Sequence, residues 1–136
     1  MSLDHDRIET LAQGFFAAVE AGDLEAVVSF YHPDVRIWHC RDEADTDIEQ
    51  SKDLLRTFFS RVADRRYEIV RRHIFDGGFV QEHVVHGTMA DGSTMRLPVC
   101  FLCHVTDDGR IIRIAEYLDA SRSPLRDVVQ HSAPPK

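Results

Sequence analysis

Apolar residues recur every three to four positions in the first part of the chain and every second position from Tyr67 onward. The first spacing is typical of helices with one buried face, and the second is typical of strands in a sheet. Helices followed by a run of strands predict an α+β fold. The buried stripe of the first helix comprises Ile8, Leu11, Ala12, Phe15, Phe16, Ala18 and Val19.

The first two predicted helices form a tight hairpin. Asp4 or Asp6 can cap the start of the first helix, and Gly22 can end it in a left-handed conformation. Asp23 then caps a short second helix, which we expect Pro33 to stop. The buried side of that helix is predicted to contain Leu24, Val27, Val28 and Tyr31.

A short strand is predicted next, over residues 35–40. Its side chains alternate, so His39 shares a face with Val35 and Ile37. Trp38 lies on the opposite face, which we expect to be the outer one. The alternation therefore places an imidazole beside two core residues.

A third helix follows an acidic stretch, 41–50, which is poor in apolar residues and is predicted to be a mobile loop. Asp47 and Gln50 have the spacing of a capping box at the start of this helix. We expect the segment beginning at Asp64 to end it. Its wide apolar face contains Leu54, Leu55, Phe58, Phe59 and Val62.

Turns rich in Asp and Gly divide the rest of the chain into an antiparallel meander. Pro98 falls inside one strand, which predicts an edge position or a bulge there. We expect one domain over residues 1–120 and a loosely ordered C-terminal tail over 121–136. The four strands are predicted at 67–75, 79–88, 94–105 and 110–118.

Composition excludes several classes of partner. The net charge is −7 and no basic stripe offsets it, which argues against binding nucleic acid through phosphates. The arginines at 65, 66, 71 and 72 alternate with apolar residues and are predicted to form a solvated sheet edge or a dimer rim. No apolar run is long enough to span a membrane. Three cysteines and no secretion signal at the start favour a cytoplasmic location.

His39 is the first candidate for chemistry. Its alternation with Val35 and Ile37 predicts that it faces the interior of a bent sheet. A histidine there can be a neutral core residue that hydrogen-bonds a backbone carbonyl. It can equally be a general base or a donor on the floor of a pocket, because its pKa lies near neutrality.

Two acids near the end of the last strand are the other candidates. Glu116 alternates with Ile112, Ile114 and Leu118, so it is predicted to face the same interior and to have a raised pKa. The alternative strand register would place it outside, paired with an arginine such as Arg113. Asp119 can lie at the mouth of the pocket or start a turn.

Neither a metal nor an organic cofactor is predicted. His83 and His86 are three residues apart in a strand, so they point to opposite faces and cannot share one ion. We expect His83 to face the interior. Cys100 and Cys103 lie in mid-strand, with no helix N-terminus to lower a thiol pKa. No nucleophile elbow, phosphate loop or dinucleotide fingerprint is present.

Two segments resemble a known family. The segment 15–34, with its Glu-Ala-Gly-Asp-Leu turn, and the closing pair Asp108-Gly109-Arg110-Ile111 and Glu116-Tyr117-Leu118-Asp119 resemble the nuclear-transport-factor-2-like (NTF2-like) superfamily. The resemblance is strongest to its SnoaL-like branch, which neighbours ketosteroid isomerases and limonene-epoxide hydrolases. It implies a cone-shaped barrel in which a strongly curved antiparallel sheet wraps around three N-terminal helices. It also implies a deep pocket and a homodimer.

The resemblance suggests roles residue by residue. The general base of ketosteroid isomerases would fall at His39, and their two oxyanion donors at Phe15 and Phe101, which have no polar group. That mechanism is therefore not expected here. The carboxylate of SnoaL-like cyclases and the late acid of epoxide hydrolases would match Glu116, or Asp119 for the cyclases.

The sequence thus predicts a small-molecule acid–base enzyme of the isomerase, cyclase, dehydratase or hydrolase type. The alternative is a non-catalytic ligand-binding or assembly module with the same fold. In the first case His39 and Glu116 or Asp119 would move protons on a small hydrophobic molecule. The substrate-binding residues are expected to be Phe15, Tyr31, Phe58, His83 and Phe101.

Overall fold

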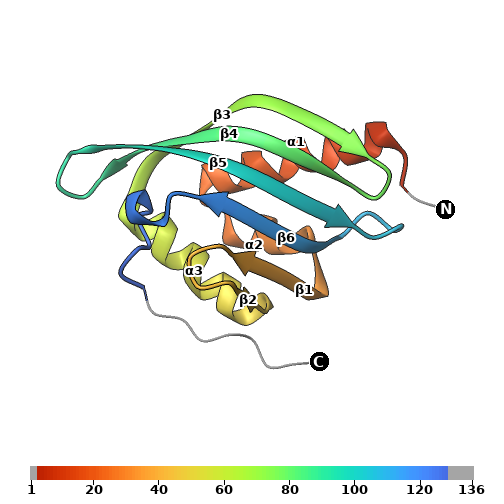
Figure 1. The fold of residues 1–136 in the computed structure, drawn as a ribbon, viewed down its shortest axis with the longest axis horizontal. Helices are drawn as coiled ribbons and strands as arrows, with labels where there is room; N and C mark the ends of the chain where they lie inside the picture. The colour runs from red at the N-terminus through yellow and green to blue at the C-terminus, as the bar shows by residue number, and fades with distance from the viewer. Residues whose placement is uncertain (1–2, 129–136) are drawn as a thin grey trace.

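The computed structural model describes residues 3–128, which form three α-helices and a six-stranded sheet (Figure 1). This is the predicted α+β fold. The helices are α1 (His5–Ala21), α2 (Leu24–Ser29) and α3 (Ile48–Arg61), and a short 3₁₀ helix, η1, covers Ala120–Arg122. The strands are β1 (Tyr31–His39), β2 (Ala44–Thr46), β3 (Val62–Phe75), β4 (Gly78–Met89), β5 (Thr94–Val105) and β6 (Ile111–Leu118).

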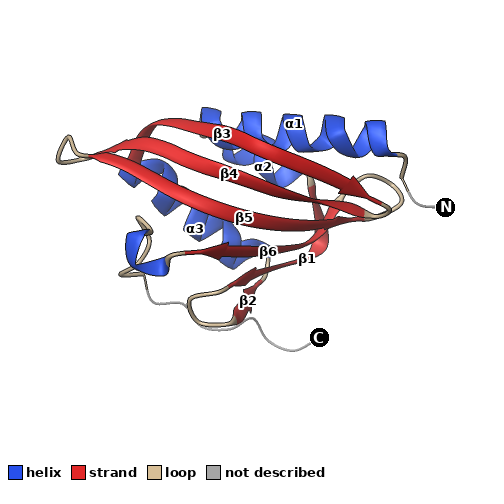
Figure 2. Cartoon of the chain, turned by 45° about the horizontal axis from the view of Figure 1, so that its top comes forward, coloured by secondary structure: helices blue, strands red, loops and turns tan. Residues whose placement is uncertain are grey.

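The strands are arranged in the order β2-β1-β6-β5-β4-β3. The sheet is strongly bent and open, and Figure 2 shows α1 along β3 at the top of the view and α3 below β5. The sheet was expected to be antiparallel throughout, but it is mixed because β1 and β6 run parallel. The apolar core lies between α1 and the concave face of the sheet, where Phe15, Phe16 and Phe79 pack together.

The helical hairpin matches the sequence prediction closely. The side chain of Asp4 accepts a hydrogen bond from the Arg7 amide, and Gly22 ends α1 with φ of 69°. Asp23 caps α2 by accepting from the amide of Ala26. The stop at Pro33 was wrong, because α2 already ends at Ser29 and β1 runs from Tyr31 through the proline. The β1–β6 register shifts between Tyr31 and Arg36, and this irregularity accommodates Pro33.

Two element boundaries around α3 also differ from the prediction. The expected loop at 41–50 contains β2, which pairs with β1 through Ile37 and Thr46. The predicted capping box is present, since Asp47 and Gln50 each accept from the other's backbone amide. The helix ends at Arg61 and β3 begins at once with Val62, five residues earlier than expected. Short polar strands such as β2 have too few side chains to show a period of two.

The meander of β3 to β6 agrees with the expected strands and turns. Gly77, Gly92 and Gly109 have positive φ in its three turns. Pro98 lies inside β5 and pairs with Val84 of β4, but the pairing of β5 with β6 begins only at Val99. On its β6 side, Pro98 is therefore at a local edge of the sheet. Its missing N–H removes no hydrogen bond between β5 and β6.

The chain after β6 folds back against the mouth of the cone. Arg41 donates to the carbonyl oxygen of Leu125, and Arg61 donates to the carbonyl oxygen of Pro124 and to the carboxylate of Asp127. Residues 121–128 of the expected tail are thus hydrogen-bonded to the domain. The remainder of that tail lies outside the described residues.

Candidate functional site

A cavity of about 180 Å³ opens at the concave face of the sheet, between α1, α3 and the chain after β6. Its walls are mainly apolar. The apolar face of α3 is only half-buried because it borders this cavity rather than a filled core. The aromatic and aliphatic lining includes Phe15, Phe16, Leu54, Leu55, Phe58, Leu97, Val99 and Phe101.

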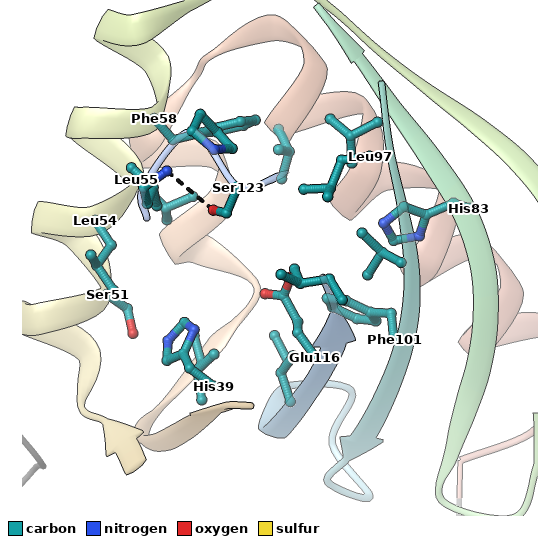
Figure 3. A pocket seen from close by; sticks show the side chains of 18 of the residues that line it. His39, Ser51, Leu54, Leu55, Phe58, His83, Leu97, Phe101, Glu116 and Ser123 are labelled. Carbon is teal, nitrogen blue, oxygen red and sulfur yellow. Dashed lines mark hydrogen bonds between the residues drawn. The ribbon is translucent and has the colours of Figure 1, made fainter. Parts of the chain in front are cut away.

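His39 and Glu116 lie side by side on the cavity floor. They are register partners in the parallel pair β1–β6, and both line the cavity (Figure 3). Neighbouring strands are about 5 Å apart, so the two side chains are attached at adjacent positions and lie on the same face of the sheet. The prediction that both would face the interior depended on strand parity, and the structure shows this orientation.

Glu116 is a carboxyl group in apolar surroundings. Burial raises its pKa to about 7. Among the residues that the structure describes, none makes a hydrogen bond or an ion pair with its carboxylate, and Arg113 pairs instead with Asp45. Figure 3 shows the carboxyl group pointing into the middle of the cavity. An ionisable group without a protein hydrogen-bond donor in such a place is the usual mark of a functional site.

His39 is held by residues from β2 and α3. Its Nε2 lies 3.3 Å from the hydroxyl oxygen of Thr46, which lies 2.9 Å from the hydroxyl oxygen of Ser51. Burial lowers the pKa of His39, so the ring is neutral at pH 7. Neither hydroxyl was a candidate in the sequence, because the strand that carries Thr46 was not predicted.

Two tyrosines also line the cavity: Tyr31, which was predicted to bind substrate, and Tyr67, which was not predicted. Burial and the nearby Glu116 raise the pKa of both Tyr31 and Tyr67. Their hydroxyl groups therefore stay protonated and can donate. Tyr67 is missing from the sequence-based site because a single aromatic residue at the start of a strand carries no signal beyond packing.

His83 lines the opposite wall, as expected from its position in β4, whereas His86 faces outward and hydrogen-bonds Glu68. Asp119 is not among the residues that line the cavity. Its carboxylate caps η1 by accepting from the amide and hydroxyl of Ser121, which lowers its pKa. Of the sequence-predicted residues, the structure brings together Phe15, Tyr31, His39, Phe58, His83, Phe101 and Glu116.

The mouth of the cavity is bordered by the segment after β6. Ala120, Ser123, Pro124 and Leu125 contribute to the lining, and the hydroxyl of Ser123 accepts from the Leu125 amide (Figure 3). Arg41 lines the same side. The described part of the C-terminal segment is therefore a wall of the cavity.

Within residues 3–128, no group of three His, Cys, Asp or Glu side chains is placed to hold a metal ion. Over the same residues, no helix has the length and apolar character needed to cross a membrane.

The sheet and helices form a cone around an apolar cavity with polar residues on its floor, and this arrangement defines a class of small α+β domains. Comparison with known proteins assigns the chain to one family. The SnoaL-like domain family matches residues 12–114. The chain therefore belongs to the SnoaL-like domain family. No sequence among the curated proteins matches it.

Solved structures share the fold at low sequence identity. AclR from Streptomyces galilaeus, a proposed hydroxylase, superposes with a TM-score of 0.79 at 12% identity, covering 90% of this chain and 96% of that one. A SnoaL-like protein of Shewanella denitrificans, assigned as a polyketide cyclase, gives 0.74 at 12% identity, covering 84% and 91%.

A further similar structure contains a small molecule. A protein of Catenulispora acidiphila with a ketosteroid isomerase-like fold, in complex with trimethylamine, gives a TM-score of 0.71 at 16% identity, covering 82% of this chain and 87% of that one. Together these likenesses show that the chain has the NTF2-like fold.

Proposed function

We propose that the protein is a small-molecule enzyme in which Glu116 transfers protons to and from an apolar or aromatic substrate. The observation that carries this proposal is the carboxyl group of Glu116, which lines an apolar cavity, makes no hydrogen bond to a described residue and has a pKa raised by burial to about 7. A group that titrates near neutral pH can both take and return a proton.

His39 is the proposed partner of Glu116. As a neutral ring beside the carboxylate, it can donate to or accept from a substrate atom on the cavity floor. In an isomerisation, the carboxylate removes a proton from one carbon, and the electron pair moves toward an oxygen of the substrate. A proton then returns to another carbon, and no cofactor is consumed. Cyclisation, dehydration and hydration use the same two groups.

A non-catalytic ligand-binding module is the second candidate. The observation in its favour is the absence of a polar group on Phe15 and Phe101, where ketosteroid isomerases would have donors. The hydroxyls of Tyr31 and Tyr67 and the ring of His83 provide other donors in the same cavity, which supports the enzyme over the module.

Solvent deuterium exchange tests the proposal without knowledge of the natural substrate. A set of small cyclic ketones and enones is incubated with the protein in deuterium oxide, and deuterium incorporation beside the carbonyl is followed by NMR. We expect catalysed exchange that falls about 10²–10⁴-fold in Glu116→Gln. Exposed His5 provides the control variant, His5→Ala, which should exchange at the wild-type rate. Exchange equal to that of buffer, or unchanged in Glu116→Gln, contradicts the enzyme.

We also propose a homodimer formed through the outer sheet face. Tyr117 is half exposed on that face and its ring lies 5.3 Å from the ring of Trp38, which together give an apolar patch. Tyr117→Asp should therefore convert a dimer into a monomer in sedimentation analysis, and a wild-type monomer at all concentrations contradicts the proposal.

A reducing compartment such as the cytoplasm suits the three free cysteines.

A further inference from the structure

A polar chain runs from α1 along the interior face of β3 and β4 to the wall of the cavity opposite Glu116. Glu9 on α1 pairs with Nη1 of Arg72 on β3. Nε of Arg72 lies 2.7 Å from Oε1 of Gln81 on β4, and Nε2 of Gln81 lies 2.7 Å from Nδ1 of His83. The side chain of Arg72 is only 10% exposed, Gln81 is fully buried, and His83 is 3% exposed. The cluster of four arginines was predicted to form a solvated sheet edge or a dimer rim. Arg72 does lie on the edge strand β3, but its side chain is almost buried and is not solvated.

The donors and acceptors along this chain allow one arrangement of protons. A guanidinium group can only donate, so the atom of Gln81 that faces Arg72 must be the amide oxygen. The NH₂ group of Gln81 then faces His83 and donates to Nδ1. Because Nδ1 accepts, the proton of the neutral imidazole must be on Nε2.

The charge state of His83 agrees with this arrangement. Burial, with a smaller contribution from Arg72, lowers the pKa of His83 to about 4, so the ring is neutral at physiological pH. The ring contacts Phe16, Tyr67 and Phe101, and no carboxylate of the described residues forms an ion pair with it. Among the described residues that line the cavity, Glu116 supplies the carboxyl group, and His83 makes no hydrogen bond with it.

The Nε2–H of His83 is left without a protein partner. None of the described residues accepts a hydrogen bond from it, although the ring lines the cavity and is directed into it (Figure 3). A buried donor without an acceptor costs about 1–3 kcal/mol, so such groups are usually satisfied by a ligand or by water. Glu9, Arg72 and Gln81 together fix the direction of this one N–H, and close packing of the core does not require such an arrangement.

We propose that His83 is a fixed neutral donor that binds an oxygen atom of the substrate, and that Arg72 and Gln81 are positioning residues that hold its proton on Nε2. The inference rests on the proposed function, since it names the substrate class for the same cavity: an apolar molecule with a carbonyl oxygen. Glu116 acts on a proton near that carbonyl, while His83 stabilises the negative charge that develops on the oxygen. A neutral donor suits this role because it does not neutralise the Glu116 carboxylate.

The tautomer of His83 is tested first, in the unmodified protein. Long-range ¹H–¹⁵N NMR spectra distinguish a ring protonated on Nε2 from one protonated on Nδ1. We expect the Nε2–H form from pH 5 to pH 8. In Gln81→Glu the new carboxylate can only accept, so the proton should move to Nδ1 or the ring should become charged. An Nδ1–H ring or a ring that titrates near 6.5 in the wild-type protein overturns the proposal.

The second test uses cyclohex-2-enone labelled with ¹³C at the carbonyl carbon as the probe. Its carbonyl resonance should move downfield on binding, because the oxygen accepts a hydrogen bond. In His83→Phe, which retains a ring of similar shape, the downfield shift should disappear and the affinity should fall about threefold to tenfold. His83→Gln should restore part of the shift. The matched control is His86→Gln on the outer face of the same strand, which should behave as wild type.

These results separate the inference from the proposed function. Glu116→Gln should abolish exchange while the carbonyl shift remains, and His83→Phe should remove the shift. A shift without exchange would mean that His83 binds the carbonyl but the protein is not the proposed enzyme. A shift that persists in His83→Phe, or an enone that does not bind the wild-type protein, overturns the role of His83.

Discussion

Glu116 is the residue on which the chemistry of this cavity depends. Its neighbours on β6 are apolar, and none of the described residues hydrogen-bonds its carboxylate. Such a group destabilises the fold when it is charged, because burial favours the protonated form. A buried carboxyl that serves no purpose would be expected to be replaced by glutamine or an apolar residue. The stability cost is therefore itself a measurable sign of function.

Glu116→Gln should stabilise the protein in a pH-dependent manner. The folded pKa is about 7 and the unfolded value is the ordinary 4.5, so the folded state binds the proton more tightly. The wild-type protein therefore loses stability as pH rises from 4.5 through 7, and the glutamine variant does not. We expect the variant to be more stable by about 1–3 kcal/mol at pH 8 and nearly equal at pH 4.5.

Urea unfolding at the two pH values measures this difference. Glu82→Gln is the matched control, because Glu82 is half exposed on β4 and should show no such pH-dependent gain. A Glu116→Gln variant that is no more stable at pH 8 than the wild type would show that the carboxylate is well solvated in the folded protein.

Two elements bring the polar groups of the cavity together. The parallel pair β1–β6 places His39 beside Glu116, and β2 with the start of α3 supplies the hydroxyls of Thr46 and Ser51. The capping box at Asp47 fixes the position where α3 begins, between these two hydroxyls. The N-terminus of α3 therefore determines how His39 is held.

Asp47→Ala should cost about 1 kcal/mol of stability, because the amide of Gln50 loses its acceptor. The amide and imidazole NMR signals of His39 should shift as well, since α3 carries Ser51. Asp53→Ala provides the comparison: this residue lies on the exposed face of the same helix and pairs with Arg56. A loss of stability no larger than that of Asp53→Ala would mean that the cap does not stabilise the helix.

The sequence predicts an element well when residues close together in the chain determine it. The helix caps at Asp4, Asp23 and Asp47 and the turns with glycine are determined within a few residues, and they were predicted. The parallel pairing of β1 with β6 joins segments about 75 residues apart, so its register is set by tertiary packing and was not predicted.

The candidate site shows the same division. Strand parity predicted the inward orientation of His39, one of the two registers considered for Glu116, and the opposite orientations of His83 and His86. Parity failed at Ile112, because a register shift near Val105 turns Ile111 inward instead. The hydroxyl of Thr46 and the link from Arg72 to His83 depend on contacts between strands and helices, which no spacing along the chain reveals.

The molecule as a whole is an open cone whose mouth is narrowed by its own C-terminal segment. Arg41 and Arg61, which come from opposite ends of the segment that contains β2 and α3, hold residues 123–128 through backbone carbonyls. Pro124 is buried at the mouth of the cavity, whereas Arg126 and Asp127 are exposed. Segments of this kind open more readily than the core and control entry to a cavity.

Arg61→Ala should loosen this segment. The variant loses the bonds to the Pro124 carbonyl and to the carboxylate of Asp127, so hydrogen exchange measured by mass spectrometry should become several-fold faster over 120–128. The sheet should be unaffected. Arg56→Ala, on the exposed face of α3, should leave this pattern unchanged. Equal exchange in both variants would show that the arginine does not hold the segment.

The titration of Glu116 shows whether its carboxyl group is buried in an apolar site. With ¹³C-labelled glutamate, the carboxyl resonance of Glu116 can be followed by NMR against pH and assigned through Glu116→Gln. We expect a midpoint near pH 7, well separated from those of the exposed glutamates. A midpoint near the ordinary 4.5 would contradict it, because a carboxylate that is ionised like a surface group is not in the apolar site from which the function is inferred.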